Sequence, residues 1–229
     1  MTLKPITSLS VERISALVIG KAGIGKTSLI RTIPINEPVC VLSAESGLLC
    51  VIDLVRSGQV KGLEISSLED FQEALDAFKC RASWTAEFKW VFIDSLTEIS
   101  DRCLEYFQEK FPNKVDTFKL WGAYADRMTA IIKAFRDLTG FNVVFTCLED
   151  IIFDEVKRKS IGPLMAGAKL KGRLLGYFDE ALYMTVDGNG KRVFYTNPNS
   201  GFPCKDRSGK LEDIEQPNLA HIAAKILGE

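Results

Sequence analysis

Short apolar runs alternate along the chain with longer segments in which apolar residues recur at helical spacing. Apolar runs of this length, bounded by turn-forming residues, are typical of strands buried on both faces. Their alternation with helical segments predicts an α/β fold with a mostly parallel central sheet flanked by helices. The four predicted strands are ISALVIG, PVCVLSA, KWVFIDS and NVVFTC, at residues 14–20, 38–44, 89–95 and 142–147.

End signals place the helices between and after these strands. Ser67 and Asp70 form a capping box, in which a side chain and the backbone at a helix start satisfy each other. Pro34, Pro112 and Gly140 each stand just beyond a helical segment, as expected past a helix end. The predicted helices run from Gly25 to about Thr32, from Ser67 to about Lys79, from 97 to 111, from Phe118 to Leu138 and from Asn218 to Leu227.

The pattern changes after the fourth strand. Residues 151–162 are mixed and basic, and residues 180–197 form two strand-like runs around the sequence DGNG at 187–190. These turn residues between two alternating runs predict a C-terminal β-hairpin. No repeat or low-complexity linker interrupts the sequence, so its 229 residues predict a single domain spanning 1–229.

Composition narrows the function classes. The chain is 46% hydrophobic and 26% charged with a formal net charge of -1, so any basic surface for nucleic acid must be local. Six cysteines without a C-x-x-C pair, beside a single histidine, argue against a zinc site. Cys40 and Cys147 lie in apolar runs and are predicted to be buried, reduced thiols.

The sequence also bears on location. The opening residues MTLKPITSLS lack the apolar segment of a signal peptide. No apolar stretch approaches the roughly 20 residues that span a bilayer. We therefore expect a cytoplasmic protein with no membrane partner.

Residues 20–28, GKAGIGKTS, match the phosphate-loop pattern G-x-x-x-x-G-K-[ST] between a predicted strand and a predicted helix. In such a loop, backbone N–H groups ring the phosphates and a helix N-terminus adds partial positive charge. Lys26 is predicted to neutralise the β- and γ-phosphates of ATP, and the Thr27 hydroxyl to bind Mg²⁺. The alternative is a glycine-rich turn without a ligand. The predicted nucleotide-binding residues are Gly20, Lys21, Ala22, Gly23, Ile24, Gly25, Lys26, Thr27 and Ser28.

Asp94 ends the apolar run WVFID, at the carboxyl end of a strand, where parallel sheets bind their ligands. We predict that it holds a water bound to Mg²⁺ beside Thr27. The alternative is an aspartate that caps the following helix. Ser95 follows where AAA-type motors carry a glutamate, so the base that polarises the attacking water must come from elsewhere.

Glu45 is the candidate for this catalytic base. It follows the second strand, whose end lies on the order of 5–10 Å from that of Asp94 if the two strands are near neighbours in the sheet. Glu98, near the start of the next helix, is the rival, although acidic residues are also favoured there by the helix dipole. The sequence leaves both carboxylates open.

The order GKAGIGKTS, VLSAESGL and VFIDSLTEI resembles the RecA-type recombinase core. The segments DSLTEI, LWGAYADRMTAIIKAFRDL and CKDRSGKL are more similar still to small phage-encoded RecA-like ATPases of single-strand annealing and recombination. The resemblance covers about Ile14 to Lys210. It implies a RecA-like P-loop NTPase core, ATP hydrolysis with Mg²⁺, and binding of single-stranded DNA. It also implies a homo-oligomer, either a ring or a filament, that acts beside a single-strand-binding protein in the bacterial host cytoplasm.

The resemblance also implies where DNA binds, because in RecA-like proteins the loops after the third and fourth strands face the DNA. A local basic cluster lies in the matching region, and such clusters bind phosphates by releasing counterions. Phe153 and Tyr177 are the aromatic residues available there to stack on bases. The alternative is a solvated basic hairpin, and Lys114, Lys119 and Trp121 offer a second surface. The predicted DNA-binding residues are Lys157, Arg158, Lys159, Lys169, Lys171 and Arg173.

Lys205 and Arg207 lie two apart in CKDRSGK, so an extended backbone would point both the same way. The resemblance implies that they act in trans, on the nucleotide of a neighbouring subunit. A solvated turn in which Asp206 balances their charge is the alternative.

The chain departs from the recombinase pattern at the end of the fourth strand, where Thr146 and Cys147 replace an Asn-Gln pair. Thr146 is the candidate to sense the γ-phosphate through its hydroxyl. The extra domains of cellular recombinases are missing, which favours annealing over full strand exchange.

Two other function classes also use a phosphate loop. A nucleotide or nucleoside kinase would use Asp101 and Arg102 as a DR motif, although helical spacing indicates an exposed charged pair, and no arginine-rich lid is present. A nucleotide-gated assembly ATPase would oligomerise without DNA.

Overall fold

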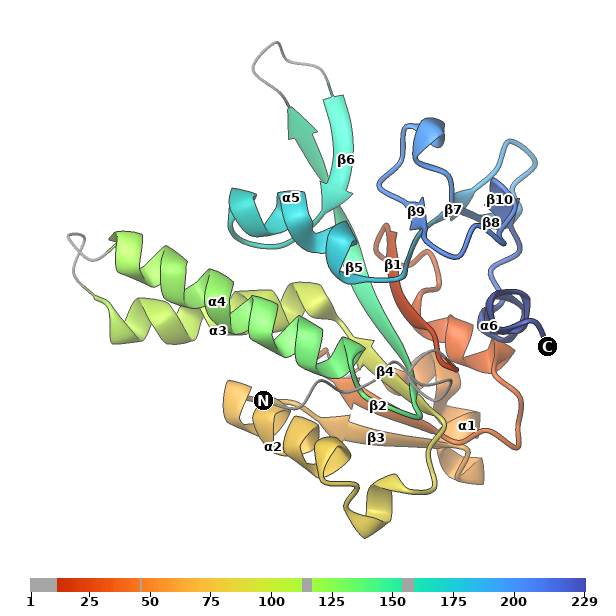
Figure 1. Cartoon of the computed structure of the whole chain (residues 1–229), viewed down its shortest axis with the longest axis horizontal. Helices are drawn as coiled ribbons and strands as arrows, with labels where there is room; N and C mark the ends of the chain where they lie inside the picture. Colours follow the sequence, from red (N-terminus) through yellow and green to blue (C-terminus); the bar gives the residue numbers. More distant parts are fainter. Residues whose placement is uncertain (1–11, 46, 113–116, 154–158) are drawn as a thin grey trace, which may run out of the picture.

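The computed structural model describes residues 12–45, 47–112, 117–153 and 159–229, and it confirms a large, mostly parallel sheet flanked by helices (Figure 1). The sheet order is β10-β8-β7-β1-β5-β4-β2-β3, with β6 paired to β5 and β9 paired to β7. The parallel strands are β1 (Ser15–Gly20), β2 (Val39–Ser43), β3 (Val60–Glu64), β4 (Trp90–Asp94), β5 (Asn142–Phe153) and β7 (Glu180–Val186). The antiparallel strands are β6 (Lys159–Pro163), β8 (Arg192–Tyr195), β9 (Lys205–Asp206) and β10 (Ile214–Glu215).

Helices cover both faces of the sheet, so the central strands are apolar on both sides (Figure 1). One face packs against α2 (Leu68–Lys79), α3 (Leu96–Lys110), α4 (Thr117–Arg136) and α5 (Ala168–Tyr177). The other packs against η2 (Thr27–Thr32), η3 (Leu48–Val51) and α6 (Leu219–Leu227), with α1 (Ile52–Ser57) beside them. Two further short 3₁₀ turns are η4 (Ser83–Thr85) and η6 (Pro198–Ser200).

Polar side chains fix the predicted helix starts. The capping box of α2 is confirmed, because Ser67 accepts a hydrogen bond from the Asp70 amide and Asp70 accepts one from the Ser67 amide. Asn218 caps α6 by accepting a hydrogen bond from the amide of His221 at 2.9 Å. Cys40 and Cys147 are buried and free, as predicted.

The structure corrects several sequence-based boundaries. The helix predicted from Gly25 is a six-residue 3₁₀ helix, η2, because only a short stretch separates the loop from Pro34 and Ile33 is already extended. The fourth predicted strand is part of β5, which runs on to Phe153 and pairs with β6 in an antiparallel arm. Local sequence patterns did not reveal α1, β3 and α5.

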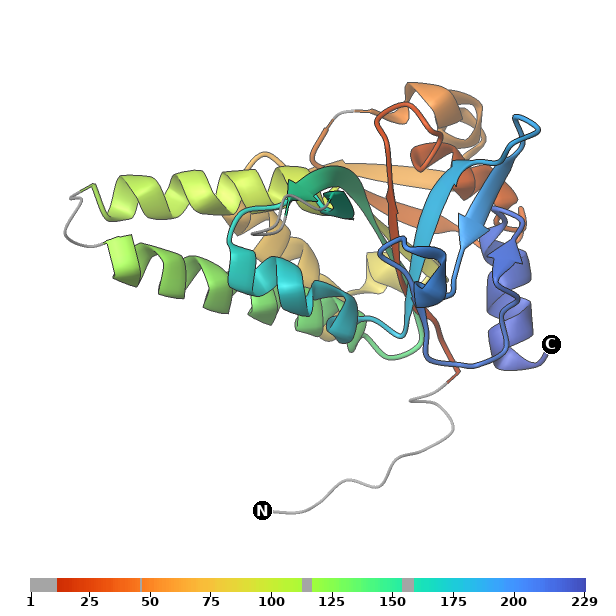
Figure 2. The ribbon, with the colours of Figure 1, turned by 90° about the horizontal axis from the view of Figure 1, so that it is seen from above.

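Two features project from the sheet. The antiparallel arm of β5 and β6 rises beyond the end of β1, and α3 and α4 form a long helical hairpin (Figures 1 and 2). Among the described residues, none of the helices is both long enough and apolar enough to cross a bilayer.

Candidate functional site

The carboxyl ends of β1, β2 and β4 meet at one edge of the sheet, where β5 continues into its arm, and the predicted site residues lie near this edge. Ser43 is in register with Asp94 on the neighbouring strands β2 and β4. Gly20 is in register with Leu148 of β5 and Met184 of β7. The phosphate loop and the carboxylates predicted to act with it are therefore brought together, as Asp94 and Glu45 follow strands that lie side by side.

Glycine is required at both ends of the phosphate loop. A Cβ built on Gly20 would lie 2.5 Å from the carbonyl oxygen of Met184, because β7 passes directly beside it. Gly25 has a φ of 105°, a conformation that side-chain-bearing residues avoid. The short η2 aligns few peptide dipoles, so the positive character of the loop comes mainly from its N–H groups and Lys26.

Lys26 folds back into the loop. Its ammonium donates hydrogen bonds to the carbonyl oxygens of Gly20 and Lys21, both at 2.8 Å. Burial lowers the pKa of Lys26, and the nearby carboxylates of Asp94 and Glu45 oppose that change. The ammonium is thus largely desolvated and is held at the start of the loop, a position from which it can neutralise a bound phosphate.

Thr27, Asp94 and Thr146 form a linked set at the base of the loop. The Thr27 hydroxyl donates to Asp94 Oδ2 at 2.6 Å, and the Thr146 hydroxyl donates to Asp94 Oδ1. Asp94 and Thr146 are both buried. The Thr146 hydroxyl is therefore engaged by Asp94 and can orient this carboxylate, while its sensing of the γ-phosphate stays a prediction.

This donor set fits Mg²⁺ bound jointly by protein and nucleotide. A hydroxyl and a carboxylate are hard oxygen ligands, and Mg²⁺ at nucleotide sites takes one or two protein ligands with phosphates and waters. Thr27 would supply such a ligand, and Asp94 would hold a water bound to the ion. The described residues contain no cluster of three or more His, Cys, Asp or Glu side chains suited to an all-protein metal site.

Glu45 lies beside the Asp94 strand end. The Ser95 hydroxyl donates a hydrogen bond to Glu45 Oε1, and the same hydroxyl accepts one from the Glu98 amide at 3.4 Å at the start of α3. The Ala44 amide donates to the carbonyl of Asp94 at 2.8 Å, which fixes the backbone just before Glu45. Glu45 is exposed, so one carboxylate oxygen is held by Ser95 and the carboxylate is open to solvent.

The rival carboxylate is already paired. Glu98 Oε1 lies 3.3 Å from Nε of Arg102, one helical turn later. Arg102 also donates to the carbonyls of Ser66 at 2.6 Å and Ala44 at 2.8 Å. The prediction of an exposed charged pair is therefore wrong for Arg102, because this side chain ties α3 to the ends of β2 and β3.

Two charged residues near the loop were missed by the sequence analysis. The guanidinium of Arg192, at the start of β8, lies against Gly25. Glu149 lies on β5, one residue after Leu148, which is in register with Gly20 of β1. It accepts a hydrogen bond from the Tyr183 hydroxyl at 2.7 Å. Neither lies in a recognisable motif, and only the pairing of β1 with β5 and β7 reveals their proximity.

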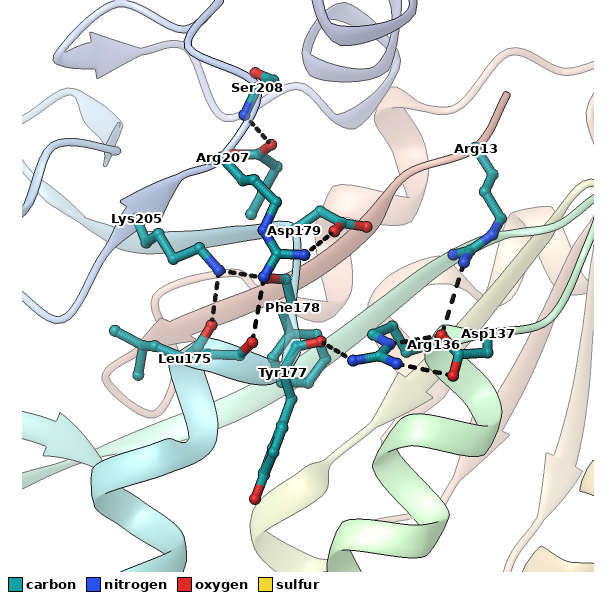
Figure 3. A network of polar contacts seen from close by, with 12 residues as sticks. Arg13, Arg136, Asp137, Leu175, Tyr177, Phe178, Asp179, Lys205, Arg207 and Ser208 are labelled. Carbon is teal, nitrogen blue, oxygen red and sulfur yellow. Dashed lines mark hydrogen bonds and ion pairs between the residues drawn. The ribbon is translucent and has the colours of Figure 1, made fainter. Parts of the chain in front are cut away.

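Lys205 and Arg207 lie on β9 and just after it, far from the phosphate loop of the same chain. Lys205 pairs with Ala181 of β7, and Ala181 pairs with Leu17 of β1. Leu17 lies three residues before Gly20, which is about 10 Å along the strand from the start of the loop. Both side chains run to the C-terminal end of α5 (Figure 3). Lys205 donates to the carbonyl of Phe178 at 2.6 Å, and Arg207 pairs with Asp179 at 2.8 Å.

The predicted DNA-binding residues are only partly described. Lys157 and Arg158 lie outside the described residues, as does the side chain of Lys159. Lys169 and Arg173 are exposed and four residues apart on α5, so they share one helix face. Lys171 instead pairs with Asp150 of β5 at 2.7 Å.

The two aromatic residues near this basic cluster differ in how far they are exposed for stacking on bases. Phe153 is 63% exposed at the end of β5. Tyr177 packs against α4, where the Lys133 ammonium lies 5.3 Å from the centre of its ring. Lys119 and Trp121, from the second predicted surface, lie at the start of α4, and Lys114 is outside the described residues.

A family model described as an AAA domain matches residues 12–208, which is most of the chain and includes the loop, Glu45, Asp94 and the β9 region. A comparison with curated proteins gives no match. The chain therefore belongs to the AAA-type P-loop ATPase family, which indicates that it binds ATP.

Proposed function

We propose that this chain is a RecA-like ATPase that binds single-stranded DNA and promotes annealing and homologous recombination, as phage-encoded proteins of this type do. One observation carries the proposal: Glu45 follows β2, the strand beside Asp94, and the residue after Asp94 is a serine that binds Glu45. In this proposal the neighbouring strand end supplies the base, as the resemblance to the RecA-type core implies. We further propose that residues 1–229 act as one domain, since helices pack on both faces of one sheet.

The proposed reaction is attack of water on the γ-phosphate of ATP. Glu45 accepts the proton of the water, while the Ser95 hydroxyl holds one of its carboxylate oxygens and fixes its orientation. Lys26 neutralises charge on the β- and γ-phosphates. Thr27 and Asp94 would hold Mg²⁺, which would supply further positive charge at the same phosphates, and Thr146 keeps the Asp94 carboxylate in place.

We also propose that the protein works as a homo-oligomer, a ring or a filament, in the bacterial host cytoplasm beside a single-strand-binding protein. Within their own chain Lys205 and Arg207 bind Phe178 and Asp179 after the end of α5, not the phosphate loop. Action on the nucleotide of a neighbouring subunit is therefore the arrangement in which they contribute to hydrolysis. Such cations couple hydrolysis to assembly, because a monomer lacks them.

The test of this function is the rate of ATP hydrolysis with and without single-stranded DNA, run beside a phosphotransfer assay with nucleosides. We expect hydrolysis that DNA stimulates and no phosphorylated nucleoside. Phosphotransfer to a nucleoside would instead identify a kinase. If DNA changes neither the rate of ATP hydrolysis nor the assembly of the protein, the chain is instead a nucleotide-gated assembly ATPase.

Single-stranded DNA is expected to lie across the β5–β6 arm and the exposed face of α5. Replacing Lys169 and Arg173 with Ala should weaken DNA binding and flatten its salt dependence, because each lost phosphate contact lowers the log–log slope by about 0.7. Replacing Lys157, Arg158 and Lys159 together should act in the same direction. The measurement is the DNA dissociation constant over a range of salt concentrations.

Lys61→Ala is the control for this prediction, since it removes one exposed charge from the edge strand β3 at the other side of the sheet. It should leave the slope unchanged. If the Lys169 and Arg173 variant keeps the wild-type slope while a variant at Lys119 and Trp121 loses it, the DNA follows the α3–α4 hairpin instead.

A further inference from the structure

Arg192 brings a guanidinium from β8 to the phosphate loop of the same chain. A Cβ built on Gly25 would lie 3.0 Å from Nη1 and 3.2 Å from Cζ of Arg192. The strand pairing explains this position. Gly20 is level with Met184 on β7, and Arg192 pairs with Val186, two residues farther along β7 in the direction of the loop. The turn between β7 and β8 thus folds Arg192 back beside Gly25.

The charge of Arg192 has no carboxylate partner within the described residues. Arg31, Arg136 and Arg207 are each paired with an aspartate, at 2.5, 2.7 and 2.8 Å. Arg192 instead lies exposed beside a loop whose N–H groups and lysine favour anions. This guanidinium is therefore placed to bind an anion that the loop holds.

We propose that Arg192 is a nucleotide-binding residue that acts in cis, with its guanidinium on the phosphate groups held by the loop. The inference rests on the proposed function, in which the loop holds ATP. A guanidinium presents a planar fork of N–H donors that matches two phosphate oxygens. The two cations then bind the phosphates from the two ends of the loop. The Lys26 ammonium lies at the carbonyls of Gly20 and Lys21, and the Arg192 guanidinium lies beside Gly25.

This position separates the role of Arg192 from that of Arg207. A cation supplied by the same chain is present in the monomer and contacts ATP before the reaction begins. An interaction made equally in the ground state and the transition state lowers KM without raising kcat. Arg192 is therefore expected to set nucleotide affinity, whereas Arg207 of a neighbouring subunit is expected to set the rate of hydrolysis.

The experiment compares wild type, Arg192→Ala, Arg192→Lys and Lys191→Ala in calorimetric titrations with ATP, ADP and inorganic tripolyphosphate. Arg192→Ala should bind all three about tenfold or more weakly, as expected for loss of a charge-assisted hydrogen bond. Its KM should rise while kcat stays close to that of wild type. Arg192→Lys should recover part of the affinity. Lys191→Ala, which removes the exposed charge of the turn residue just before β8, should bind as wild type does.

A thermal melt without nucleotide completes the comparison, because an exposed arginine contributes little to folding and the melting temperature of Arg192→Ala should match wild type. If Arg192→Ala binds all three compounds as wild type does, while Lys26→Ala does not, the loop function stands and the role of Arg192 is refuted. Loss of ATP and ADP affinity with tripolyphosphate binding retained would place the guanidinium on the base or ribose, which also overturns the proposal. Absence of binding by wild type would overturn both this inference and the proposed function.

Discussion

Arg207→Ala is expected to hydrolyse ATP about 10³–10⁵-fold more slowly than wild type in the assembled protein, the effect of losing a cation that stabilises the transition state in trans. Folding should be little affected. The Arg207 side chain is 53% exposed, and surface ion pairs such as the one with Asp179 contribute about 0–1 kcal/mol. In the isolated chain this arginine rests on Asp179 and the end of α5, so assembly must redirect it to the neighbouring nucleotide.

A mixing experiment tests action in trans. Lys26→Ala carries an intact Arg207, and Arg207→Ala carries an intact phosphate loop, so each alone should be nearly inactive. In mixed oligomers some interfaces combine the intact loop with the intact arginine, and ATP hydrolysis should partly return. No recovery in oligomers shown to contain both variants, or full activity of Arg207→Ala alone, would leave CKDRSGK as a structural turn.

Glu45→Gln is expected to bind ATP and to hydrolyse it about 10²–10⁴-fold more slowly, because glutamine keeps the shape of the side chain but takes up no proton. The amide oxygen can still accept the hydrogen bond from Ser95, so the local structure should persist. Nucleotide binding and single-turnover hydrolysis, measured separately, give the two quantities needed.

Glu98→Gln is the matched control for this variant. Its carboxylate is paired with Arg102 at 3.3 Å, so its loss should weaken a structural contact and leave most of the hydrolysis intact. Slow hydrolysis by Glu98→Gln together with normal hydrolysis by Glu45→Gln would show that Glu98, and not Glu45, is the catalytic base.

The sequence was most informative where function depends on strand ends. Because parallel strands end at one edge, locating the ends of β1, β2 and β4 was enough to place the loop, Glu45 and Asp94 together. The apolar runs that mark these strands are buried on both faces and therefore easy to recognise. The edge strand β3 was missed because only Val60 among its residues is buried.

Other parts of the site could not be found from local patterns. Arg192 reaches Gly25 only through the pairing of β1 with β7 and of β7 with β8, a contact between residues far apart in sequence. Lys171 belongs to a basic segment in sequence, yet the fold places Asp150 against it and neutralises its charge. The helix α5 was missed because two glycines interrupt its helical pattern.

We propose above all that the loop around Lys26 binds and hydrolyses ATP. Its most direct test is ATP hydrolysis by purified wild type and by folded Lys26→Ala, measured with Mg²⁺ under the same conditions. Lys26 supplies the buried ammonium held beside Gly20 and Lys21, and we expect turnover to fall to background when it is removed. Undiminished hydrolysis by folded Lys26→Ala would contradict it.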